Sequence, residues 1–406
     1  MKRLLFLLSG NISTTPRALK SIQLALQNGH KVDVCLINRL DKWKELDKHI
    51  LATLSCNVTY IPFRKEEGML IWILVGILHR LSIWLAKPVR NNLIINAFAS
   101  SKINILYYLK LRKLCENYDM VLGYSGMFYP AFIFSKQHSI PFSFDMEDFH
   151  PGEVIYHKGK KEESIRRIKM LKCILPLASY VSYGSPLIEK KMVELLGRYN
   201  VNIPYGFPLN NTFRHSDFIY SGCNEDKVQF IWFSQTISFG RGLDLILPAL
   251  EKYKELIRLT LIGNMDNRFY QEVLLPYKDF IIVKEALPQE DLHKVIGKYD
   301  IGLALEQNVD ENKTICLSNK IFTYLLAGLY VVATPTEAQK LLMAKFPDHG
   351  IVVDSTIEKM DACIRNIINN IQTIRIEKEH RFKDISTISW EYEEKKLLYA
   401  WNKFLG

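Results

Sequence analysis

Short apolar runs alternate with stretches of helical spacing along most of the chain. An apolar run at residues 4–8 is followed by a helical spacing over residues 17–27, then by Gly29, and then by a second apolar run at residues 32–37. Continuous apolar runs are typical of strands in a parallel sheet that is covered on both faces. Glycine commonly ends a helix. This opening therefore predicts a β-α-β unit.

The same alternation continues in two blocks, separated by the turn-rich segment 202–208. Further apolar runs occupy residues 120–122, 141–144 and 180–183 in the first block, and residues 228–233, 259–262, 280–283, 301–304, 330–333 and 351–353 in the second. Strands that alternate with helices build a parallel sheet with helices on both faces. We therefore expect an α/β fold with two doubly wound, Rossmann-like domains, at residues 1–207 and 208–388. A helical pattern at residues 389–406 predicts a terminal helix that packs on either domain or crosses back to the first.

Composition and cysteine usage limit the class of protein. The chain has 406 residues, of which 48% are apolar, and this suits a globular protein of roughly two or three domains. Its seven cysteines are scattered and form no C-x-x-C pair, which favours a reducing compartment and argues against a disulfide framework or a zinc site. The apolar run after Met1-Lys2-Arg3 is too short for a signal peptide, so we expect it to be the first strand. These features predict a cytoplasmic protein.

The net charge of +10 is unevenly placed. Residues 68–115 contain no Asp or Glu and hold the basic residues Arg80, Lys87, Arg90, Lys102, Lys110, Arg112 and Lys113. Within this segment the apolar run 69–78, with Trp72 and Trp84, is too short and too interrupted to span a bilayer. It predicts a helix that lies in the interface of an anionic membrane; the alternative is an ordinary buried helix beside a solvated basic face. Long aliphatic runs between the basic residues argue against nucleic acid as a partner.

Polar loops after the predicted strands are the candidate sites, because open α/β sheets bind ligands beyond the carboxyl ends of their strands. One loop is acidic: Asp145, Glu147, Asp148 and His150 directly follow the apolar run 141–144. Such groups can orient sugar hydroxyls, act as acid or base, or bind a metal. The alternative is structural, with Asp148 as a helix cap and His150 as its satisfied neighbour.

Two further loops predict phosphate binding. In the loop 234–243, Gly240 and Gly242 flank Arg241 at a helix start, so that backbone N–H groups and a guanidinium converge. The second helix start is at Ser318, a good N-cap, and its first turn carries Lys320 but no carboxylate. A bound anion would relieve that conflict with the helix dipole.

Residues 318–339 also predict how this second helix is placed. Gly328 is positioned to end it, and its polar members Asn319, Lys320 and Thr323 share one stripe. That stripe faces water or a lined cleft, and the alternative is a buried helix with a snorkelling lysine. Two positive helix starts in one domain and an acidic loop in the other suggest a cleft for a nucleotide sugar and a sugar-like acceptor. After the first strand, Gly10 permits close approach of a ligand to the backbone.

The same residues resemble the GT-B glycosyltransferases, specifically the large retaining family numbered 4, over nearly the whole chain. The matching segments are Pro16-Arg17, Gly29-His-Lys-Val-Asp-Val34, the loop 145–150, the strand and turn 178–185, the link 202–208, Arg241-Gly-Leu243, Leu261-Ile-Gly263 and Asn319-Lys-x-Phe-x-Tyr-x-x-Ala-Gly328. The resemblance implies two Rossmann-like domains that face each other across a cleft.

The resemblance also implies roles for individual residues. The second domain would hold the donor nucleotide sugar, with Arg241 and Lys320 steadying the diphosphate as charge develops on it. His150 and Asp148 would position the acceptor or the transferred sugar, with Glu147 and Arg17 on the acceptor side. The remaining donor-binding positions would be Gly10, Ser234, Gln235, Gly240, Gly242, Gly263, Ser318, Asn319 and Thr323. It implies neither a metal nor any other cofactor, and no side-chain base.

Three positions depart from the family pattern. Thr323 stands where the family usually has a glutamate that resembles a ribose ligand, Gln235 where it commonly has an arginine, and Tyr205 where the link usually has asparagine. These departures leave the nucleotide open. The sequence thus predicts a glycosyltransferase at the inner face of a membrane that adds sugar to a saccharide or lipid-linked acceptor for a surface polysaccharide or lipopolysaccharide. The alternatives are a nucleotide-sugar epimerase of the same fold and a non-catalytic subunit that binds sugar nucleotide and docks on membranes.

Overall fold

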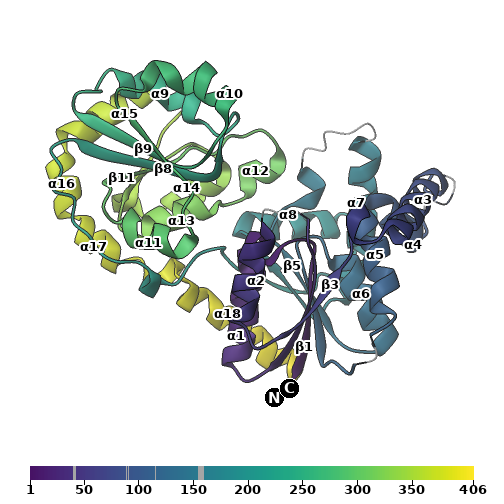
Figure 1. The fold of residues 1–406 in the computed structure, drawn as a ribbon. Helices are drawn as coiled ribbons and strands as arrows, with labels where there is room; N and C mark the ends of the chain where they lie inside the picture. Colours follow the sequence, from purple (N-terminus) through teal and green to yellow (C-terminus); the bar gives the residue numbers. More distant parts are fainter. Residues whose placement is uncertain (40–42, 88, 90, 115, 154–159) are drawn as a thin grey trace. The chain divides into compact units, whose positions relative to one another are not determined.

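The computed structural model describes residues 1–39, 43–87, 89, 91–114, 116–153 and 160–406 (Figure 1). The chain forms two compact units. Unit 1 comprises Met1–Leu209 and Glu394–Gly406, and unit 2 comprises Asn210–Glu393. Each unit has its own parallel sheet with helices around it.

Unit 1 is built on a seven-stranded sheet in the order β3-β2-β1-β4-β5-β6-β7. Its strands are β1 (Arg3–Leu8), β2 (Lys31–Ile37), β3 (Asn57–Ile61), β4 (Met120–Tyr124), β5 (Phe142–Met146), β6 (Tyr180–Tyr183) and β7 (Tyr205–Pro208), and every neighbouring pair is parallel. Because the strand order reverses between β1 and β4, the carboxyl ends of these strands flank a topological switch point, where such sheets bind ligands.

Two edge strands differ from the sequence expectation. β3 was not predicted, because most of its residues are partly or fully exposed and the apolar signal is weak. β7 lies within the segment that we read as a turn-rich link, yet Tyr205 pairs with Tyr180 and Pro208 with Tyr183. Glycine and proline weaken a central strand but are tolerated at an edge, where one side of the backbone makes no ladder.

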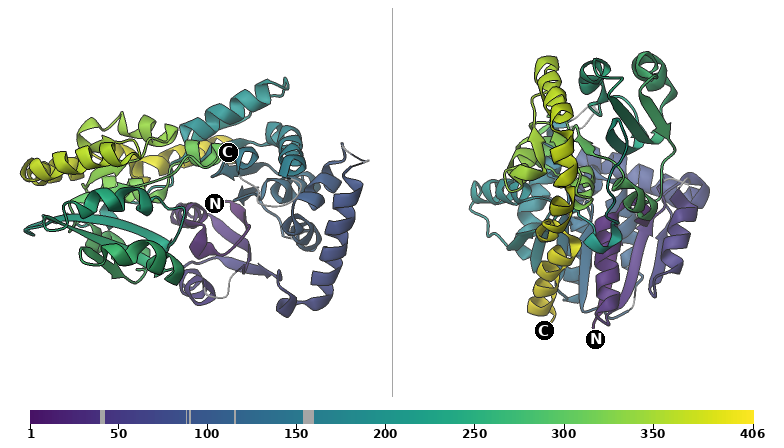
Figure 2. Two further views of the ribbon diagram at one scale, coloured as in Figure 1. Left: turned by 90° about the horizontal axis from the view of Figure 1, so that it is seen from above. Right: turned by 90° about the vertical axis from the view of Figure 1, so that its left-hand side faces the viewer.

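Helices cover both faces of the unit 1 sheet (Figure 1). They are α1 (Pro16–Gln27), α2 (Lys44–Ala52), α3 (Met69–Leu85), α4 (Leu93–Ser100), α5 (Lys102–Leu111), α6 (Phe128–His138), α7 (Lys160–Ile174) and α8 (Pro186–Gly197). In Figure 1, α1 and α2 lie on one side of the sheet, and α5 and α6 lie on the other. α3 packs on α4 and α5 rather than on the sheet, and it forms the outer edge of unit 1 in the left view of Figure 2.

Unit 2 repeats the design with six strands in the order β10-β9-β8-β11-β12-β13. These are β8 (Val228–Ile237), β9 (Ile257–Met265), β10 (Ile281–Lys284), β11 (Ile301–Ala304), β12 (Tyr330–Ala333) and β13 (Gly350–Val352). The helices are α9 (Leu243–Glu251), α10 (Asn267–Phe269), α11 (Gln289–Ile296), α12 (Glu311–Ile315), α13 (Asn319–Leu326), α14 (Glu337–Met343), α15 (Ile357–Asn369), α16 (Ile371–Ile376) and α17 (Lys378–Lys383).

The sheet of unit 2 separates two apolar clusters. Alternate residues of a strand point to opposite faces, so Phe230 and Trp232 of β8 belong to one cluster and Ile231 between them belongs to the other. Here the strand order reverses between β8 and β11. The loops after these two strands are therefore the places to look for a ligand.

The last helix, α18 (Trp390–Leu405), has residues in both units. At its start, the amide of Trp390 donates to the carbonyl of Phe213 at 2.8 Å, within unit 2. Near its end, the indole N–H of Trp401 donates to the hydroxyl of Tyr180 at 2.8 Å, within unit 1. The terminal helix thus makes its first contact within unit 2 and its last within unit 1.

Two findings bear on the expected environment. The six cysteines in the described part of the chain are all free thiols, and the seventh, Cys115, lies outside it. Among the described residues, no helix combines the length and the apolar character needed to cross a bilayer.

Candidate functional sites at the carboxyl ends of the two sheets

The glycine loop after β8 packs directly on the chain that follows β11. Gly240 and Gly242 both have positive φ, at 70° and 82°. A Cβ atom on Gly242 would lie 2.3 Å from the carbonyl oxygen of Leu305, the residue after β11. Only glycine satisfies both the backbone conformation and this contact. The start of α9 is therefore held against Leu305.

The N-terminus of α13 lies beside the next residue, Glu306. Lys320, in its first turn, forms an ion pair of 2.7 Å with Glu306, and its ammonium nitrogen lies 6.0 Å from the ring centroid of Trp232. Burial raises the pKa of Glu306, but Lys320 and Ser318 outweigh burial and hold it below its ordinary value. The positive charge that seemed to need an anion is thus already paired with a carboxylate.

Sequence reasoning missed Glu306. Its position could have identified it, because it follows the apolar run 301–304 by two residues. Polar residues just beyond the carboxyl end of a strand are candidate ligand contacts, as in the acidic loop. The two helix starts also differ in charge. The first turn of α9 carries Asp244, whose negative charge partly neutralises the positive end of the helix dipole. The first turn of α13 carries no acid. The α13 start therefore has no carboxylate of its own to complement its dipole, and the Glu306 carboxylate lies beside it instead.

The other predicted residues of this edge are placed as follows. Arg241 is exposed at the tip of the glycine loop and has no ion-pair partner among the described residues. Ser318 is at the N-cap position of α13 without capping through its side chain, and Asn319 is half-buried beside it. A Cβ atom on Gly263 would lie 2.3 Å from the carbonyl oxygen of Ser234. The carbonyl of Gln235 accepts from the Asn264 side chain at 3.0 Å, while its own side chain is exposed.

Thr323 corrects the prediction of a polar stripe on α13. Its side chain is fully buried, and its hydroxyl donates to the carbonyl of Asn319 at 2.9 Å. A threonine in a helix can satisfy its hydroxyl on the carbonyl four residues earlier, so this polar side chain does not require water or a cleft. In this structure Thr323 offers no group to a donor, and only Asn319 and Lys320 of the stripe are accessible.

In unit 1, the acidic end of β5 is organised by a buried ion pair. Arg17 and Asp145 are 1% and 3% exposed, and their side chains form a bidentate contact, with one of the two hydrogen bonds at 2.8 Å. Arg17 also donates to the carbonyl of Leu209, and Ser182 donates to Asp145. The predicted acceptor-side role of Arg17 is therefore corrected: its guanidinium is enclosed and holds the end of β5 to the end of unit 1's main segment.

Glu147 lies two residues after Asp145 in the chain, and its surroundings raise the pKa of its carboxyl group. Burial raises the pKa of Glu147 to about 7; Arg17 opposes the shift, and the charges of Asp148 and Asp145 support it. The backbone around it is tight, because a Cβ atom on Gly184 would lie 2.2 Å from the carbonyl oxygen of Glu147. A carboxyl group with this pKa exchanges protons near neutral pH.

His150 and Asp148 lie in the loop that follows. The amide of His150 donates to the carbonyl of Asp148 at 3.0 Å, and Phe149, rather than Asp148, holds the N-cap position of the short turn His150–Gly152. The His150 ring approaches Glu153 at 3.3 Å, and Arg167 of α7 donates to the His150 carbonyl at 2.9 Å. Burial alone would raise the pKa of Glu153, but His150 and Arg167 lower it to about 2. The loop is thus fixed by charged contacts to α7.

Gly10 lies in unit 1, apart in sequence from the rest of the predicted donor set. It is buried in the turn after β1. The next residue, Asn11, donates to Asn38 at 3.1 Å and to Asp47 at 2.7 Å, and its side-chain oxygen accepts from the amide of Arg39 at 3.0 Å. The loops after β1 and β2 are therefore joined at the carboxyl edge of the sheet, with Gly10 beside them.

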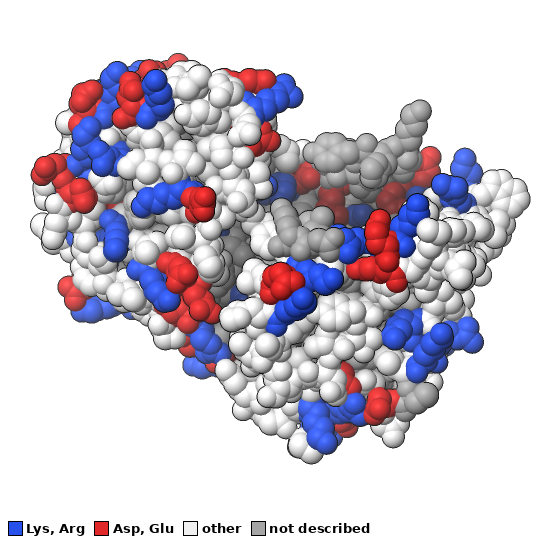
Figure 3. Space-filling model, viewed as in Figure 1, with Lys and Arg blue, Asp and Glu red and all other residues white. Residues whose placement is uncertain are grey.

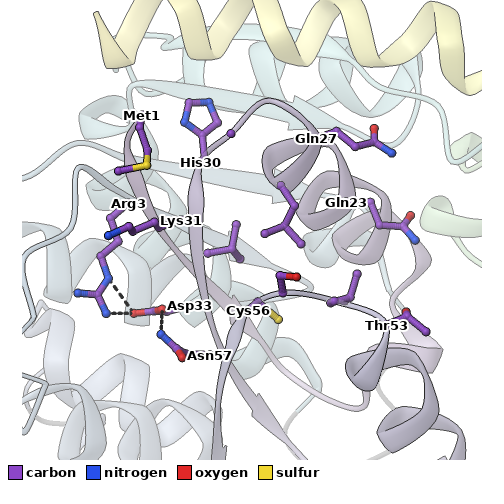
Figure 4. Close-up of a pocket in the computed structure, with 15 residues that line it drawn as sticks. Met1, Arg3, Gln23, Gln27, His30, Lys31, Asp33, Thr53, Cys56 and Asn57 are labelled. Atoms are coloured by element: carbon purple, nitrogen blue, oxygen red, sulfur yellow. Dashed lines mark hydrogen bonds and ion pairs between the residues drawn. The ribbon is translucent and has the colours of Figure 1, made fainter.

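A cavity of about 1070 Å³ occupies the opposite edge of unit 1, at the starts of β1 and β2 (Figure 4). Its charged groups are already engaged with one another: Arg3 bonds Asp33 at 2.7 Å and 3.1 Å, and Asn57 donates to the same carboxylate at 2.8 Å. This edge carries none of the predicted site residues. Elsewhere in the described part of the chain, no three His, Cys, Asp or Glu side chains gather as a metal site would require.

Comparison with known proteins places the fold. No family model and no curated protein matches the sequence. Among solved structures, Anabaena HepE in complex with UDP has a TM-score of 0.61 at 14% identity, over 97% of this chain and 99% of that one. Sucrose-phosphate synthase from Thermosynechococcus elongatus has a TM-score of 0.65 at 11% identity, over 99% of each chain. UDP-GlcNAc 2-epimerase from Neisseria meningitidis, bound to UDP-GlcNAc, has a TM-score of 0.58 at 12% identity, over 98% of this chain and 100% of that one.

These likenesses extend over both units, and together with the two doubly wound parallel sheets they define the GT-B fold. The expected fold class is confirmed. At this level of identity the likeness is one of fold, so the activity has to be argued from the site.

Proposed function

We propose that the protein is a glycosyltransferase that moves a sugar from a nucleotide-sugar donor to a saccharide or lipid-linked acceptor. The observation that carries the proposal is the edge of unit 2, where the glycine loop and the start of α13 meet at residues 305 and 306. Two helix starts and two basic side chains on one edge suit a diphosphate. The UDP bound in the Anabaena HepE structure, a protein of the same fold, supports this choice of ligand.

On this proposal, the donor diphosphate displaces or shares the ion pair of Lys320. Lys320 moves its ammonium group from Glu306 toward the phosphate, and Arg241 supplies a second cation from the exposed loop. Backbone N–H groups at Gly242 and Asn319 complete the contacts. These groups stabilise the negative charge on the departing nucleoside diphosphate. Such a transfer is retaining and needs no metal, as in the family that the sequence resembles.

The acceptor belongs at the acidic loop of unit 1. Glu147 and Asp148 would hydrogen-bond sugar hydroxyls, and His150 would position the acceptor or the transferred sugar. Glu147, with a pKa of about 7 caused chiefly by burial, is suited to accept or return a proton there. Arg17 and Asp145 act through the loop by holding it in place. We further propose that the acceptor is a precursor of a surface polysaccharide or lipopolysaccharide, at the cytoplasmic face of a membrane.

An epimerase is the second candidate, because a UDP-GlcNAc 2-epimerase has the same fold. The two functions differ in their need for an acceptor: an epimerase converts its nucleotide sugar alone, whereas a transferase releases nucleoside diphosphate faster when an acceptor is present. A non-catalytic binding subunit would bind the nucleotide without turnover. These outcomes separate all three functions in one assay.

A thermal-shift screen with UDP, GDP, ADP and their sugars is the first test. At about one hundred times the dissociation constant, a ligand stabilises its protein by roughly 2.7 kcal/mol, which raises the midpoint of unfolding measurably. The nucleotide that does so is then used in the turnover assay with and without saccharide acceptors. Absence of both binding and turnover over the whole panel would contradict the proposal.

A further inference from the structure

Helix α3 exposes an apolar face to the solvent, whereas an ordinary surface helix exposes a polar one. Its outer residues follow helical spacing and are nearly all apolar: Leu70, Ile73, Leu74, Ile77, Leu81 and Trp84 are each more than 40% exposed, with Leu70 at 85% and Trp84 at 69%. An amphipathic helix on a globular protein normally shows the opposite arrangement, with polar residues outward. The alternative of an ordinary buried helix, which the sequence left open, is therefore wrong.

The inner side of α3 carries Ser82 and His79. Ser82 is buried with Val75, and the ring of His79 hydrogen-bonds the carbonyl of Phe98 in α4 at 2.7 Å. The helix is thus anchored to unit 1 by its inner face, through α4 and α5. Its apolar outer face is exposed to solvent among the described residues, and the helix lies at the edge of the unit in the left view of Figure 2.

The chain around this face carries an excess of positive charge, because the two exposed acids just before α3, Glu66 and Glu67, are preceded by Arg64 and Lys65. From residue 68 to residue 115 the chain contains no acid, and the exposed Arg80 and Lys87 lie on and just after α3. Lys102, at the start of α5, lies over the ring of Trp72, with its nitrogen 5.5 Å from the ring centroid. In Figure 3 the surface at the α3 and α4 end of unit 1 is largely white, with Lys and Arg in blue and some Asp and Glu in red beside it. Arg90, also expected in this basic set, lies outside the described residues.

We propose that the outer face of α3 inserts into the headgroup region of an anionic lipid surface. The helix has 17 residues, about 25 Å at 1.5 Å per residue, which is shorter than the roughly 30 Å core of a bilayer. A helix with an apolar face, tryptophans and basic neighbours lies in the interface plane and is held there by apolar insertion and by attraction to anionic lipids. This inference rests on the membrane-bound part of the proposed function and specifies the surface that performs it.

Charge complementarity selects lipid over a second copy of the chain. A second copy of the chain would add the same excess of basic residues, since residues 64–115 hold nine Lys or Arg against Glu66 and Glu67, and Glu67 is already paired with Arg64 at 3.2 Å. An anionic lipid surface supplies the missing negative charge. The apolar face and the basic residues then serve one occupant.

The test is sedimentation of the full chain with vesicles. Vesicles of phosphatidylcholine with about a third phosphatidylglycerol provide the anionic surface, and pure phosphatidylcholine vesicles provide the neutral one. Replacing Leu70 and Ile77 together by serine is expected to weaken binding to anionic vesicles by roughly tenfold or more, since both side chains leave the inserted face. Replacing Arg80 and Lys87 by glutamine is expected to weaken it by roughly fivefold for each charge, with little effect on neutral vesicles.

The matched control replaces Leu177 and Ile376 by serine. These residues are 62% and 79% exposed and lie outside α3, so the control should bind vesicles as the wild type does. Equal losses in the control and the Leu70/Ile77 variant, or no binding by the wild type, would overturn the inference. So would a wild-type dimer that the Leu70/Ile77 variant abolishes in the absence of lipid. The nucleotide thermal shift, measured on the same proteins, reports separately on donor binding.

Discussion

Replacing Lys320 and replacing Glu306, which form an ion pair, should change the affinity for the nucleoside diphosphate in opposite directions. If Lys320 contacts the donor diphosphate, Lys320→Ala weakens binding of the nucleoside diphosphate, whereas Glu306→Gln strengthens it. The reason is that Glu306 competes with the phosphate for the same ammonium group, which it now contacts at 2.7 Å. A purely structural pair predicts no such opposition, because either change would loosen the site in the same direction.

The magnitudes follow from the geometry. A phosphate on the far side of the Lys320 ammonium lies ~5 Å from the Glu306 carboxylate. At that distance the repulsion of two unit charges is between ~0.8 kcal/mol at a dielectric constant of ~80 and ~3 kcal/mol at ~20. Both side chains are partly screened from solvent, so Glu306→Gln should tighten binding by roughly tenfold. Lys320→Ala removes a charged hydrogen bond of about 1.5 to 3 kcal/mol, which weakens binding by roughly 10- to 150-fold.

Isothermal titration calorimetry with the nucleoside diphosphate chosen by the thermal-shift screen measures both changes. Lys320→Ala also leaves Glu306 largely buried and unpaired, which costs about 1 to 3 kcal/mol of stability. The double variant Lys320→Ala/Glu306→Gln removes that cost and controls for folding; it should bind as weakly as a site without Lys320. The reasoning is refuted if Glu306→Gln weakens binding as Lys320→Ala does, or if both variants bind as the wild type.

Three further predictions concern single positions. Gly242→Ala should destabilise unit 2 by more than ~1 kcal/mol and impair donor binding, while Gly240→Ala, where a Cβ meets no neighbour within 4 Å, should cost only about 1 kcal/mol for its positive φ; equal urea midpoints would contradict the tight contact. Glu147 has a raised pKa in the folded state, so its contribution to stability is complete below pH ~4.5 and is lost as the pH rises through about 7. Glu147→Gln should remove up to ~3 kcal/mol of this dependence, and parallel pH curves in urea unfolding would argue against it. Arg17→Met leaves the Asp145 carboxylate buried and unpaired, and it should lower the free energy of unfolding by about 3 to 5 kcal/mol, whereas a change below ~1 kcal/mol would show that Asp145 has found another partner.

Central strands were predictable because burial on both faces leaves a continuous apolar run. β11 and β12 have the bounds expected at residues 301–304 and 330–333. Edge strands lack that signal: β3 is mostly polar or exposed, and β7 contains Gly206 and Pro208. A linear pattern cannot distinguish a link from an edge strand, because the difference lies in pairing with a strand distant in sequence.

The candidate site was predictable to the level of loops. The rule that ligands bind at carboxyl ends found the loops after β5 and β8 and the start of α13. It could not show how side chains within them pair. Thr323 and Lys320 share a helical stripe, yet one is buried on a backbone carbonyl and the other joins Glu306. Likewise, Arg17 is a polar residue near a predicted site, and only the packing around Asp145 shows that it is enclosed.

The proposed sugar transfer is tested most directly by release of nucleoside diphosphate from a nucleotide sugar. The assay uses UDP-, GDP- and ADP-sugars with the wild type and with Lys320→Ala, each with and without saccharide and polyprenyl-phosphate-linked acceptors. We expect one donor to be cleaved faster when an acceptor is present, with the sugar recovered on the acceptor and with the rate reduced in Lys320→Ala. Conversion of the nucleotide sugar without any acceptor, or binding without turnover across the panel, would contradict the account.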